Sequence, residues 1–504
     1  MTDPLPALVS LIGAGPGDPG LITVRGREAL QRAACVLHDH LANPALLKLA
    51  PQAEHIYVGK KRSDHAATQT EIIDLLILKS RAGLRVARLK GGDPYLFGRG
   101  GEEAEALAAA GIPFEVIPGV TASLGIGAYS GVPLTHRDHN SAVTFVTGHD
   151  PASINWPAVA ASETLVVYMG LSTIGEIAAR LIAAGRSPDT PAIAVRWGTR
   201  PEQASLRATL ATLAARIDAE HLRPPATIII GDVVSLSDRL NWYERLPLFG
   251  QRIVLTRAEE QAAETAEILR ALGAGVIELP TIAIRPPLSW AALDTAIERL
   301  STYDWIVFTS VNGVRFFLER LDASTHDLRS LRAKIAVIGE RTRDAVQALH
   351  LKADLVPHEF VAESLLEAFA AHELAGARIL IPRAEIAREL LPIGLRNRGA
   401  TVDVVPAYRN AIPEDAATQA AELFAHTAQH APPHWITFTA ASTVKNLLTL
   451  VPREALAHTR IASIGPVTTE ALLKHGLTVD AEASPYTIPG MIAAILTSTA
   501  RTRD

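Results

Sequence analysis

The chain has a single cysteine, Cys35, among its 504 residues. One thiol cannot form an intramolecular disulfide and is too few for a cysteine-based metal cluster, so we expect no metal and a reducing cytoplasm. A strong excess of either charge is missing as well, because the formal net charge is −5. Bulk electrostatics therefore give no reason to expect a nucleic-acid partner.

Long uninterrupted apolar runs are also absent. The longest uncharged stretch, residues 116–134, contains four glycines and two prolines, which is typical of loops and packing and not of a membrane span. Residues 1–6 lack the basic and apolar regions of a signal peptide. We therefore expect a soluble cytoplasmic protein with no membrane partner. The 48% hydrophobic content can fill several cores, and the length predicts three or four domains.

Two glycine-acid loops follow strand-like runs in the first part of the chain. Residues 13–20 (GAGPGDPG) close the apolar run 8–12, and residues 91–94 (GGDP) close another run. In a parallel sheet the loops that follow the strands emerge at one edge, so these loops predict a single small-molecule site.

A dinucleotide fold is the obvious alternative for the first loop. Residues 15–20 satisfy the G-x-G-x-x-G pattern, and Asp39 follows at about the spacing expected of a ribose-binding acid. A pyrophosphate, however, is held by backbone N–H groups, and Pro16 and Pro19 each lack one. The loop is better suited to a nucleoside-type ligand without phosphate, so we set NAD aside.

Five motifs of this region occur in a characteristic order. They are residues 13–20, residues 59–62 (GKKR), residues 88–103 (RLKGGDPYLFGRGGEE), residues 118–122 (PGVTA) and residues 133–138 (PLTHRD). Together they resemble uroporphyrinogen-III C-methyltransferase of the tetrapyrrole methylase family, from about Val9 to Val234. The resemblance implies S-adenosylmethionine as methyl donor, a two-domain α/β architecture with the site between the domains, and a homodimer formed through this half.

The resemblance also implies site residues. Asp39, which ends a strand-like run, is the expected proton acceptor, and Lys60 is the expected proton donor. Otherwise Asp39 is a helix cap or turn residue, and Lys60 belongs to an exposed charge run. Where the family usually has tyrosine and arginine beside the aspartate, this chain has His38 and His40.

Ligand contacts follow from the same motifs. Methionine on an apolar strand is otherwise ordinary core, and an arginine is otherwise solvated or salt-bridged. The residues expected at S-adenosylmethionine are Pro16, Gly91, Gly92, Asp93, Leu96, Thr121, Ala122, Met169, Gly198 and Ala226. Because uroporphyrinogen carries eight carboxylates, cations are expected near it; besides Lys60, the candidates are Arg99, His136 and Arg137.

The second half contains an internal repeat. Residues 254–257, 305–310 and 338–342 return as residues 380–383, 435–440 and 464–468, at an offset of about 126–130 residues. This offset is too long for a solenoid repeat and suits a duplicated α/β domain, with helices such as 262–272 and 342–349 between short strands. We expect the aromatic residues of the repeated strands to be core.

These motifs resemble uroporphyrinogen-III synthase, from about Arg252 to Met491. The predicted fold class is therefore α/β throughout, a two-domain methylase unit followed by a duplicated two-domain synthase unit. The expected domains are 1–246, with parts 1–135 and 136–246, and 247–504, with one part made of 250–283 and 410–504 and the other of 284–409. The junction near 244–250 is too short for a long flexible tether.

The synthase half needs no cofactor, since much of its chemistry can come from folding a linear tetrapyrrole. Tyr408 matches a tyrosine that the family places at its site, where it could assist loss of hydroxyl; otherwise it is a structural tyrosine. Ser310, Thr342 and Ser442 are expected to donate to substrate carboxylates. Alanine stands at Ala440 where the repeat leads us to expect serine.

The two halves share a metabolite. The synthase converts hydroxymethylbilane to uroporphyrinogen III, and the methyltransferase methylates that product twice to precorrin-2, which leads to cobalamin or siroheme. Up to Asp504 no dehydrogenase or metal-insertion pattern follows, so siroheme synthesis by this chain alone is not expected. The alternatives are a methylase of a later corrin intermediate, and a second half that serves only as a binding or regulatory module.

Overall fold

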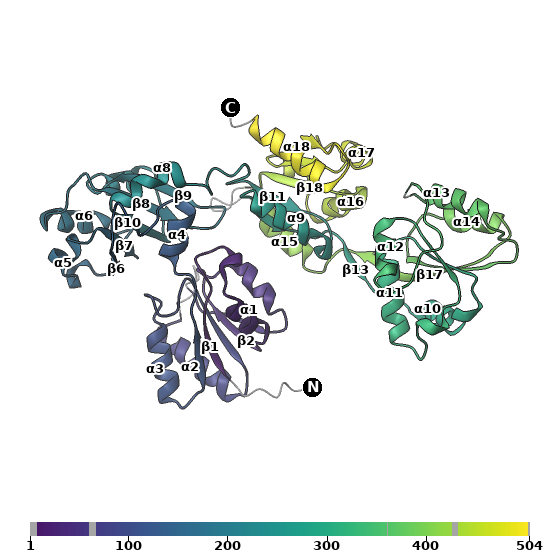
Figure 1. The fold of residues 1–504 in the computed structure, drawn as a ribbon, viewed down its shortest axis with the longest axis horizontal. Coiled ribbons are helices and arrows are strands. Elements are labelled where there is room, and N and C mark those ends of the chain that lie inside the picture. Colours follow the sequence, from purple (N-terminus) through teal and green to yellow (C-terminus); the bar gives the residue numbers. More distant parts are fainter. Residues whose placement is uncertain (1–7, 60–66, 360, 426–431, 502–504) are drawn as a thin grey trace. The chain divides into compact units, whose positions relative to one another are not determined.

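The structure is a computed structural model that describes residues 8–59, 67–359, 361–425 and 432–501. The chain divides into two compact units (Figure 1). One comprises Met1–Arg252 with Ile268–Gly275, and the other comprises Ile253–Glu267 with Val276–Asp504. Four five-stranded sheets form the framework, two at residues 9–230 and two at residues 252–482. The predicted α/β class is confirmed.

The first sheet is parallel in all its pairs, with the order β3-β2-β4-β1-β5. Its strands are β1 (Val9–Gly13), β2 (Cys35–His38), β3 (Glu54–Tyr57), β4 (Val86–Lys90) and β5 (Phe114–Ile117). The accompanying helices are α1 (Val24–Gln31), α2 (Gln69–Arg81) and α3 (Gly100–Ala109). Both β1 and β4 are buried along their whole length, as central strands covered on both faces must be.

The second sheet is mixed, with the order β6-β7-β10-β8-β9. Its strands are β6 (Val143–Thr147), β7 (Thr164–Tyr168), β8 (Pro191–Arg196), β9 (Ala204–Thr209) and β10 (Ala226–Ile230). The helices are α4 (Ala122–Ser130), α5 (Trp156–Ala160), α6 (Ile174–Ala183), α7 (Leu213–Ala219) and α8 (Ser237–Leu240). Because Ile126 belongs to the core under this sheet, α4 packs on the second sheet although it directly follows the first.

The third sheet combines segments far apart in the sequence, in the order β12-β11-β18-β19-β20. Its strands are β11 (Arg252–Leu255), β12 (Gly275–Glu278), β18 (Trp435–Phe438), β19 (Arg460–Ser463) and β20 (Ala481–Glu482). The helices are α9 (Glu259–Ala271), α15 (Ala416–Phe424), α16 (Ala441–Leu450), α17 (Pro466–Lys474) and α18 (Ile488–Ala500).

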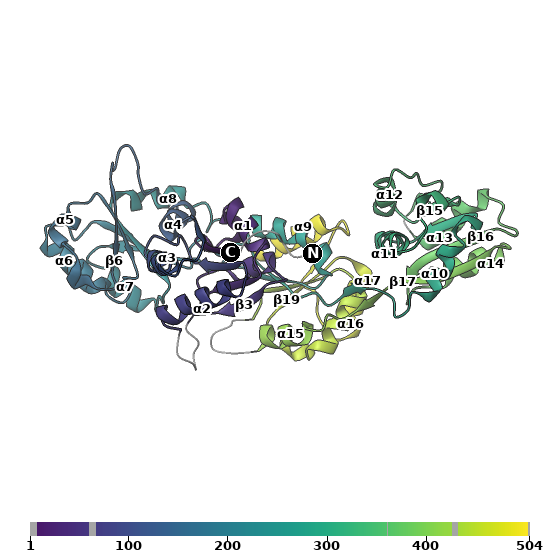
Figure 2. The same cartoon turned by 90° about the horizontal axis from the view of Figure 1, so that it is seen from below.

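The fourth sheet is formed by residues between β12 and β18 of the third sheet, and its strand order is β13-β17-β16-β14-β15. Its strands are β13 (Ala283–Arg285), β14 (Trp305–Phe308), β15 (Lys334–Val337), β16 (Arg378–Ala384) and β17 (Thr401–Ala411). The helices are α10 (Ala291–Glu298), α11 (Val311–Asp322), α12 (Glu340–Gln347), α13 (Ala362–Ala368) and α14 (Leu390–Asn397). β13 pairs antiparallel with the end of β17, so the chain enters and leaves this region along two adjacent strands (Figures 1 and 2).

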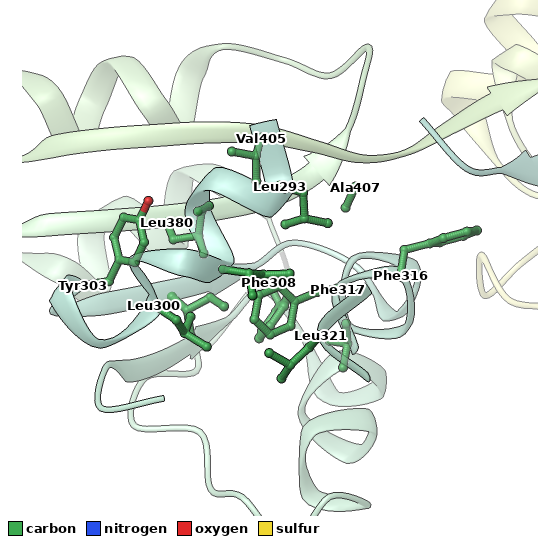
Figure 3. Packing of buried hydrophobic residues seen from close by; sticks show 14 of the residues in the cluster. Leu293, Leu300, Tyr303, Phe308, Phe316, Phe317, Leu321, Leu380, Val405 and Ala407 are labelled. Carbon is green, nitrogen blue, oxygen red and sulfur yellow. The ribbon is translucent and has the colours of Figure 1, made fainter. Parts of the chain in front are cut away.

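The repeated aromatic strands are core, as predicted. Trp305, Phe308, Trp435 and Phe438 are all buried. Phe308 packs edge to face on Phe317 of α11, with ring centroids 5.6 Å apart, inside the cluster of Figure 3. The expected helices at 262–272 and 342–349 correspond to α9 and α12. No helix in the described ranges is long and apolar enough to span a membrane.

Candidate active sites

Two glycine loops of the first sheet hold each other in place. The loop after β1 and the loop after β4 exchange a reciprocal pair of backbone hydrogen bonds. The N–H of Gly15 donates to the carbonyl of Gly92 at 3.2 Å, and the N–H of Gly92 donates to the carbonyl of Gly15 at 2.8 Å. Both glycines have a positive φ, 77° and 67°, which a residue with a Cβ adopts only at a cost.

A third loop, which follows β5, packs against these two. A Cβ added to Gly119 would lie 2.4 Å from the carbonyl oxygen of Gly92, and one added to Gly13 would lie 2.5 Å from the Cα of Gly119. Such distances are far below van der Waals contact. Only glycines therefore allow the three backbones to approach this closely.

Asp93 ties the same loops together through its carboxylate. Oδ1 accepts hydrogen bonds from the N–H groups of Tyr95 and Leu96, at 2.8 and 3.2 Å, and Oδ2 accepts one from Gly119 at 3.1 Å. The structure shows that Asp93 orders its own loop and joins it to the loop after β5.

Three expected ligand residues come together at one edge of the second sheet. β10 runs antiparallel to β7 and β8, so the ends of β7 and β8 meet the start of β10 there. Met169 follows β7, Gly198 follows β8, and Ala226 begins β10. The Met169 side chain is 53% exposed, so the interpretation of this residue as ordinary core is wrong.

The backbone around these edges is strained. Of the seven described non-glycine residues with positive φ, five lie in the loops after β4, β7 and β8: Phe97, Arg99, Met169, Trp197 and Thr199. Non-glycine residues in this conformation cost free energy and cluster at functional sites. The strain therefore supports the assignment of a ligand site to these loops.

Direct contacts join the two edges. Tyr168, the last residue of β7, has its hydroxyl oxygen 2.7 Å from Oγ1 of Thr121 and 3.1 Å from the backbone nitrogen of Ser123. The backbone N–H of Asp18 donates to Oγ1 of Thr199 at 2.9 Å.

Further expected ligand residues lie at this junction. Pro16 packs on Gly125 of α4, and Leu96 and Ala122 pack on the core of the second sheet. Gly91 packs on Leu41 in the loop beyond β2.

The donor set of the loop after β1 argues against a pyrophosphate. The N–H groups of Gly15, Asp18 and Gly20 donate to Gly92, Thr199 and the Asp18 carboxylate, and Pro16 and Pro19 have none. What the loops offer is close backbone approach and an exposed methionine, Met169. A nucleoside-type ligand without phosphate stays the expectation for these loops.

Asp39 lies directly after β2, at the same edge of the first sheet as the glycine loops. Its Oδ1 accepts a hydrogen bond from the N–H of Leu41 at 3.0 Å, and its Oδ2 is 3.4 Å from a guanidinium nitrogen of Arg88. The side chain keeps 21% of its surface exposed. A carboxylate that is oriented by two partners and partly open to solvent can accept a proton from a bound molecule.

In the second half, Tyr408 and Ser310 form a pair. Their hydroxyl oxygens are 3.0 Å apart, and the Tyr408 ring stacks on Phe316 at a centroid distance of 5.9 Å. Ser310 is also the N-cap of α11, where its Oγ accepts the N–H of Gly313 at 3.0 Å. Tyr408 is buried, so its hydroxyl is held in a defined direction.

The other two expected substrate residues of this half lie at helix starts. Thr342 is buried in the first turn of α12, and Ser442 is exposed in the first turn of α16. The N-cap of α16 is Ala440, whose φ and ψ of −162° and 153° nearly equal the −164° and 157° of Ser310. The serine-to-alanine difference in the repeat therefore removes a hydroxyl and leaves the backbone unchanged.

Comparison with known proteins covers both halves. The family profile described as Tetrapyrrole (Corrin/Porphyrin) Methylases matches residues 8–214, and the profile described as Uroporphyrinogen-III synthase HemD matches residues 263–493. The Porphyrin biosynthesis protein HemD of Ruminiclostridium josui is 38% identical over 496 residues, which cover 97% of this chain and 97% of that protein. The chain belongs to this family of fused methylases and synthases.

Two further proteins are similar to parts of the chain. The Uroporphyrinogen-III C-methyltransferase of Bacillus subtilis is 38% identical over 347 residues, or 68% of this chain and 71% of that protein. A crystal structure of Uroporphyrin-III C-methyl transferase from Thermus thermophilus, complexed with S-adenyl homocysteine, is 41% identical, with a TM-score of 0.40 and coverage of 46% of this chain and 100% of that one. The chain is thus a bifunctional HemD-type fusion, with a C-methyltransferase half before a synthase half.

The structure gives different surroundings to the cations expected in the methyltransferase half. Arg99 is exposed and forms a two-pronged ion pair with Glu102, at 2.7 and 2.9 Å. Arg137 is exposed, whereas Nδ1 of His136 accepts the N–H of Asp138 inside a turn. Lys60 lies outside the described residues. No group of three potential metal ligands is found in the described part of the chain.

Sequence reasoning missed other residues at this site. Tyr168 and Thr199 join the two sheet edges, and Arg88 contacts Asp39. Arg200 stacks over the Trp197 ring at 4.3 Å and donates to the carbonyl of Leu41 at 2.8 Å. The one available signal was the alternation of basic residues along residues 86–90, because charged side chains inside a buried strand require partners.

Proposed function

We propose that the synthase half closes hydroxymethylbilane into uroporphyrinogen III, and that the methyltransferase half then adds two methyl groups from S-adenosylmethionine to give precorrin-2. The observation that carries this proposal is the junction of the two sheet edges in the methyltransferase half. Three closely packed glycine loops meet a strained edge there, and the loop donors are unsuited to phosphate. Asp39 lies at the same edge.

S-adenosylmethionine, when bound, supplies an electrophilic methyl group on sulfur. We assign its binding to the expected residues on both edges. From the first edge these are Pro16, Gly91, Gly92, Leu96, Thr121 and Ala122, with Asp93 acting through the loops that it orders. From the second edge they are Met169, Gly198 and Ala226. Their support is the close backbone approach at the glycines and the outward Met169 side chain.

The chain's own task in methylation is to handle a proton. A pyrrole system that accepts a methyl group at carbon becomes cationic, and it returns to neutrality when it loses a proton. We assign acceptance of that proton to the Asp39 carboxylate, which Leu41 and Arg88 orient. The proton-donor role of Lys60 stands on the resemblance alone. Arg99, His136 and Arg137 are assigned to the substrate carboxylates.

In the synthase half, we assign general-acid assistance to the Tyr408 hydroxyl. Loss of the hydroxymethyl oxygen as water requires a proton, and the paired Ser310 hydroxyl fixes the direction of the phenol. The main contribution is still the folding of the linear tetrapyrrole, which brings its two ends together. Ser310, Thr342 and Ser442 are assigned to substrate carboxylates.

A single experiment tests both activities. The purified full-length chain is incubated with hydroxymethylbilane, with and without S-adenosylmethionine, and the products are separated by chromatography with mass detection. We expect the III isomer without S-adenosylmethionine and its doubly methylated derivative with it. Spontaneous closure gives the I isomer, so formation of that isomer alone would refute the synthase assignment. Failure to methylate supplied uroporphyrinogen III would favour action on a later corrin intermediate.

The assembly state and compartment belong to the same proposal. A chain with a single cysteine suits a reducing compartment, and we place the enzyme in the cytoplasm. We expect a homodimer formed through the methyltransferase half, which light scattering on the purified chain would detect. A monomer at all concentrations would contradict this expectation.

A further inference from the structure

A buried group of charged side chains lies beneath the edge that carries Asp39. Arg88 and Lys90 are alternate residues of β4, so both side chains project to the same face of the sheet. Each is only 4% exposed, and Glu103 of α3 is fully buried. One carboxylate oxygen of Glu103 lies 2.8 Å from Nζ of Lys90 and 3.3 Å from Nε of Arg88.

The charges of this group do not cancel by themselves. Two cations face one buried carboxylate, and the second carboxylate in contact with them is that of Asp39, 3.4 Å from the far end of the Arg88 guanidinium. The order of contacts is therefore Lys90, Glu103, Arg88, Asp39. With Asp39 included, the group contains two basic and two acidic side chains.

Buried ion pairs contribute little net stability, because desolvation offsets the Coulomb attraction, and apolar replacements are often as stable or more so. Burial, followed by the neighbouring Arg88 cation, lowers the pKa of Lys90. The second carboxylate oxygen of Glu103 has no hydrogen-bond partner among the described residues. Stability alone does not explain such an arrangement, whereas a functional role of Asp39, at the partly exposed end of the group, does.

We propose that Arg88 and Glu103 are positioning residues for methyl transfer, with Glu103 fixing the Arg88 guanidinium and Arg88 holding the Asp39 carboxylate in its orientation. The proposal rests on the proposed function, in which Asp39 accepts a proton. The pyrrole carbon forms its bond to the methyl group as the sulfur–methyl bond breaks. The bond between the leaving proton and the ring system then breaks. Its electron pair stays in the ring system, and the proton passes to the Asp39 carboxylate.

The decisive variant is Glu103→Gln in the full-length chain, which keeps the side-chain size and one acceptor oxygen but removes the charge. We expect kcat for methylation of uroporphyrinogen III to fall by roughly 10- to 100-fold, as for other residues that orient a reacting group. KM and the affinity for S-adenosylhomocysteine should change less than about twofold, because Glu103 is fully buried and is not among the residues assigned to either ligand. The matched control is Glu105→Gln, two residues along α3 and exposed, which should retain full activity.

The pH profile of kcat separates positioning from a structural effect. The charged and titratable described groups around Asp39 are His38 of β2, Tyr57 of β3, and Arg88 and Lys90 of β4. Because a neighbouring cation favours the charged form of a carboxyl group, its loss in Arg88→Gln should move the acidic limb of the profile to higher pH. Loss of the anion in Glu103→Gln should move it down. Arg88→Lys, which keeps the charge, should restore the wild-type limb.

Each outcome bears on one claim. Unchanged kcat in both Glu103→Gln and Arg88→Gln would overturn the proposal, and so would a fall in kcat with an unmoved acidic limb. If Arg88→Gln does not fold, as judged by circular dichroism and S-adenosylhomocysteine binding, the kcat and pH profiles of Glu103→Gln and Arg88→Lys decide whether the proposal holds. Full methylation activity of Asp39→Asn would refute the proposed role of Asp39 itself, and with it a positioning role of Arg88 and Glu103 that acts through Asp39.

Discussion

Asp93 illustrates how one side chain can order several loops. Its carboxylate holds three backbone N–H groups, two from its own loop and one from the loop after β5. All three donors would lose their acceptor in an alanine variant. The loops that carry Gly92 and Thr121 would then be free to separate.

We therefore expect Asp93→Ala to weaken binding of S-adenosylhomocysteine by on the order of 1.5–3 kcal/mol, the range for hydrogen bonds to a charged group. Isothermal titration calorimetry on the full-length chain measures this directly. Asp93→Asn, which keeps one carbonyl acceptor, should lose less. An affinity equal to wild type in Asp93→Ala would remove this residue from the site.

At this scale the sequence selected residues but not their contacts. Asp39 and Asp93 were selected because they match the motifs that carry the family resemblance, and their roles at the site stay predictions. The link from Asp39 through Arg88 to Glu103 could not be predicted, because it depends on which face of α3 meets the sheet. The exposed position of Met169 rules out the core alternative for this residue, and it accompanies a left-handed backbone at the end of an apolar strand.

At the scale of elements, the glycine loops behave as one packed body. Gly119→Ala would place a methyl group 2.4 Å from the carbonyl oxygen of Gly92, so the loops must move apart. Overpacking of this kind costs about 1–3 kcal/mol, and we expect affinity for S-adenosylhomocysteine to fall by roughly 5- to 100-fold, since 1.4 kcal/mol corresponds to a factor of 10.

The control for this variant is Gly101→Ala, in the first turn of α3. A Cβ at Gly101 meets no atom within 4 Å, and its φ is not in the positive region. S-adenosylhomocysteine should bind this control as it binds wild type. Equal affinity in both variants would show that the close loop packing is not required for the site.

Regular elements were the most predictable part of the fold. Short apolar strands that alternate with helices specify an α/β chain, and the repeated Trp-x-x-Phe strands are buried as expected. The packing of α4 on the second sheet was harder to foresee, because the helix follows the last strand of the first sheet directly. Sequence proximity favours the wrong partner there, whereas Ile126 and Ala122 of α4 both pack in the core of the second sheet.

At the scale of the whole molecule, the two activities should fail independently. In the full-length chain, Asp39→Asn should lose most methylation yet still produce uroporphyrinogen III from hydroxymethylbilane. Tyr408→Phe should slow cyclisation by roughly 10²-fold or more if the phenol supplies general-acid help, while supplied uroporphyrinogen III is methylated normally. Stopped assays with chromatographic isomer analysis measure both rates. Loss of both activities in either variant would contradict independent sites.

The two N-caps of the synthase half show that a duplicated scaffold can keep its shape while its copies diverge in chemistry. Ser310 and Ala440 have nearly the same backbone angles at the same point of the repeat, yet only Ser310 contributes a hydroxyl and pairs with a tyrosine. One copy can thus retain a reactive group while the other is free to drift. For protein engineering, position 440 is therefore a site at which a polar side chain could be introduced without a change in the backbone.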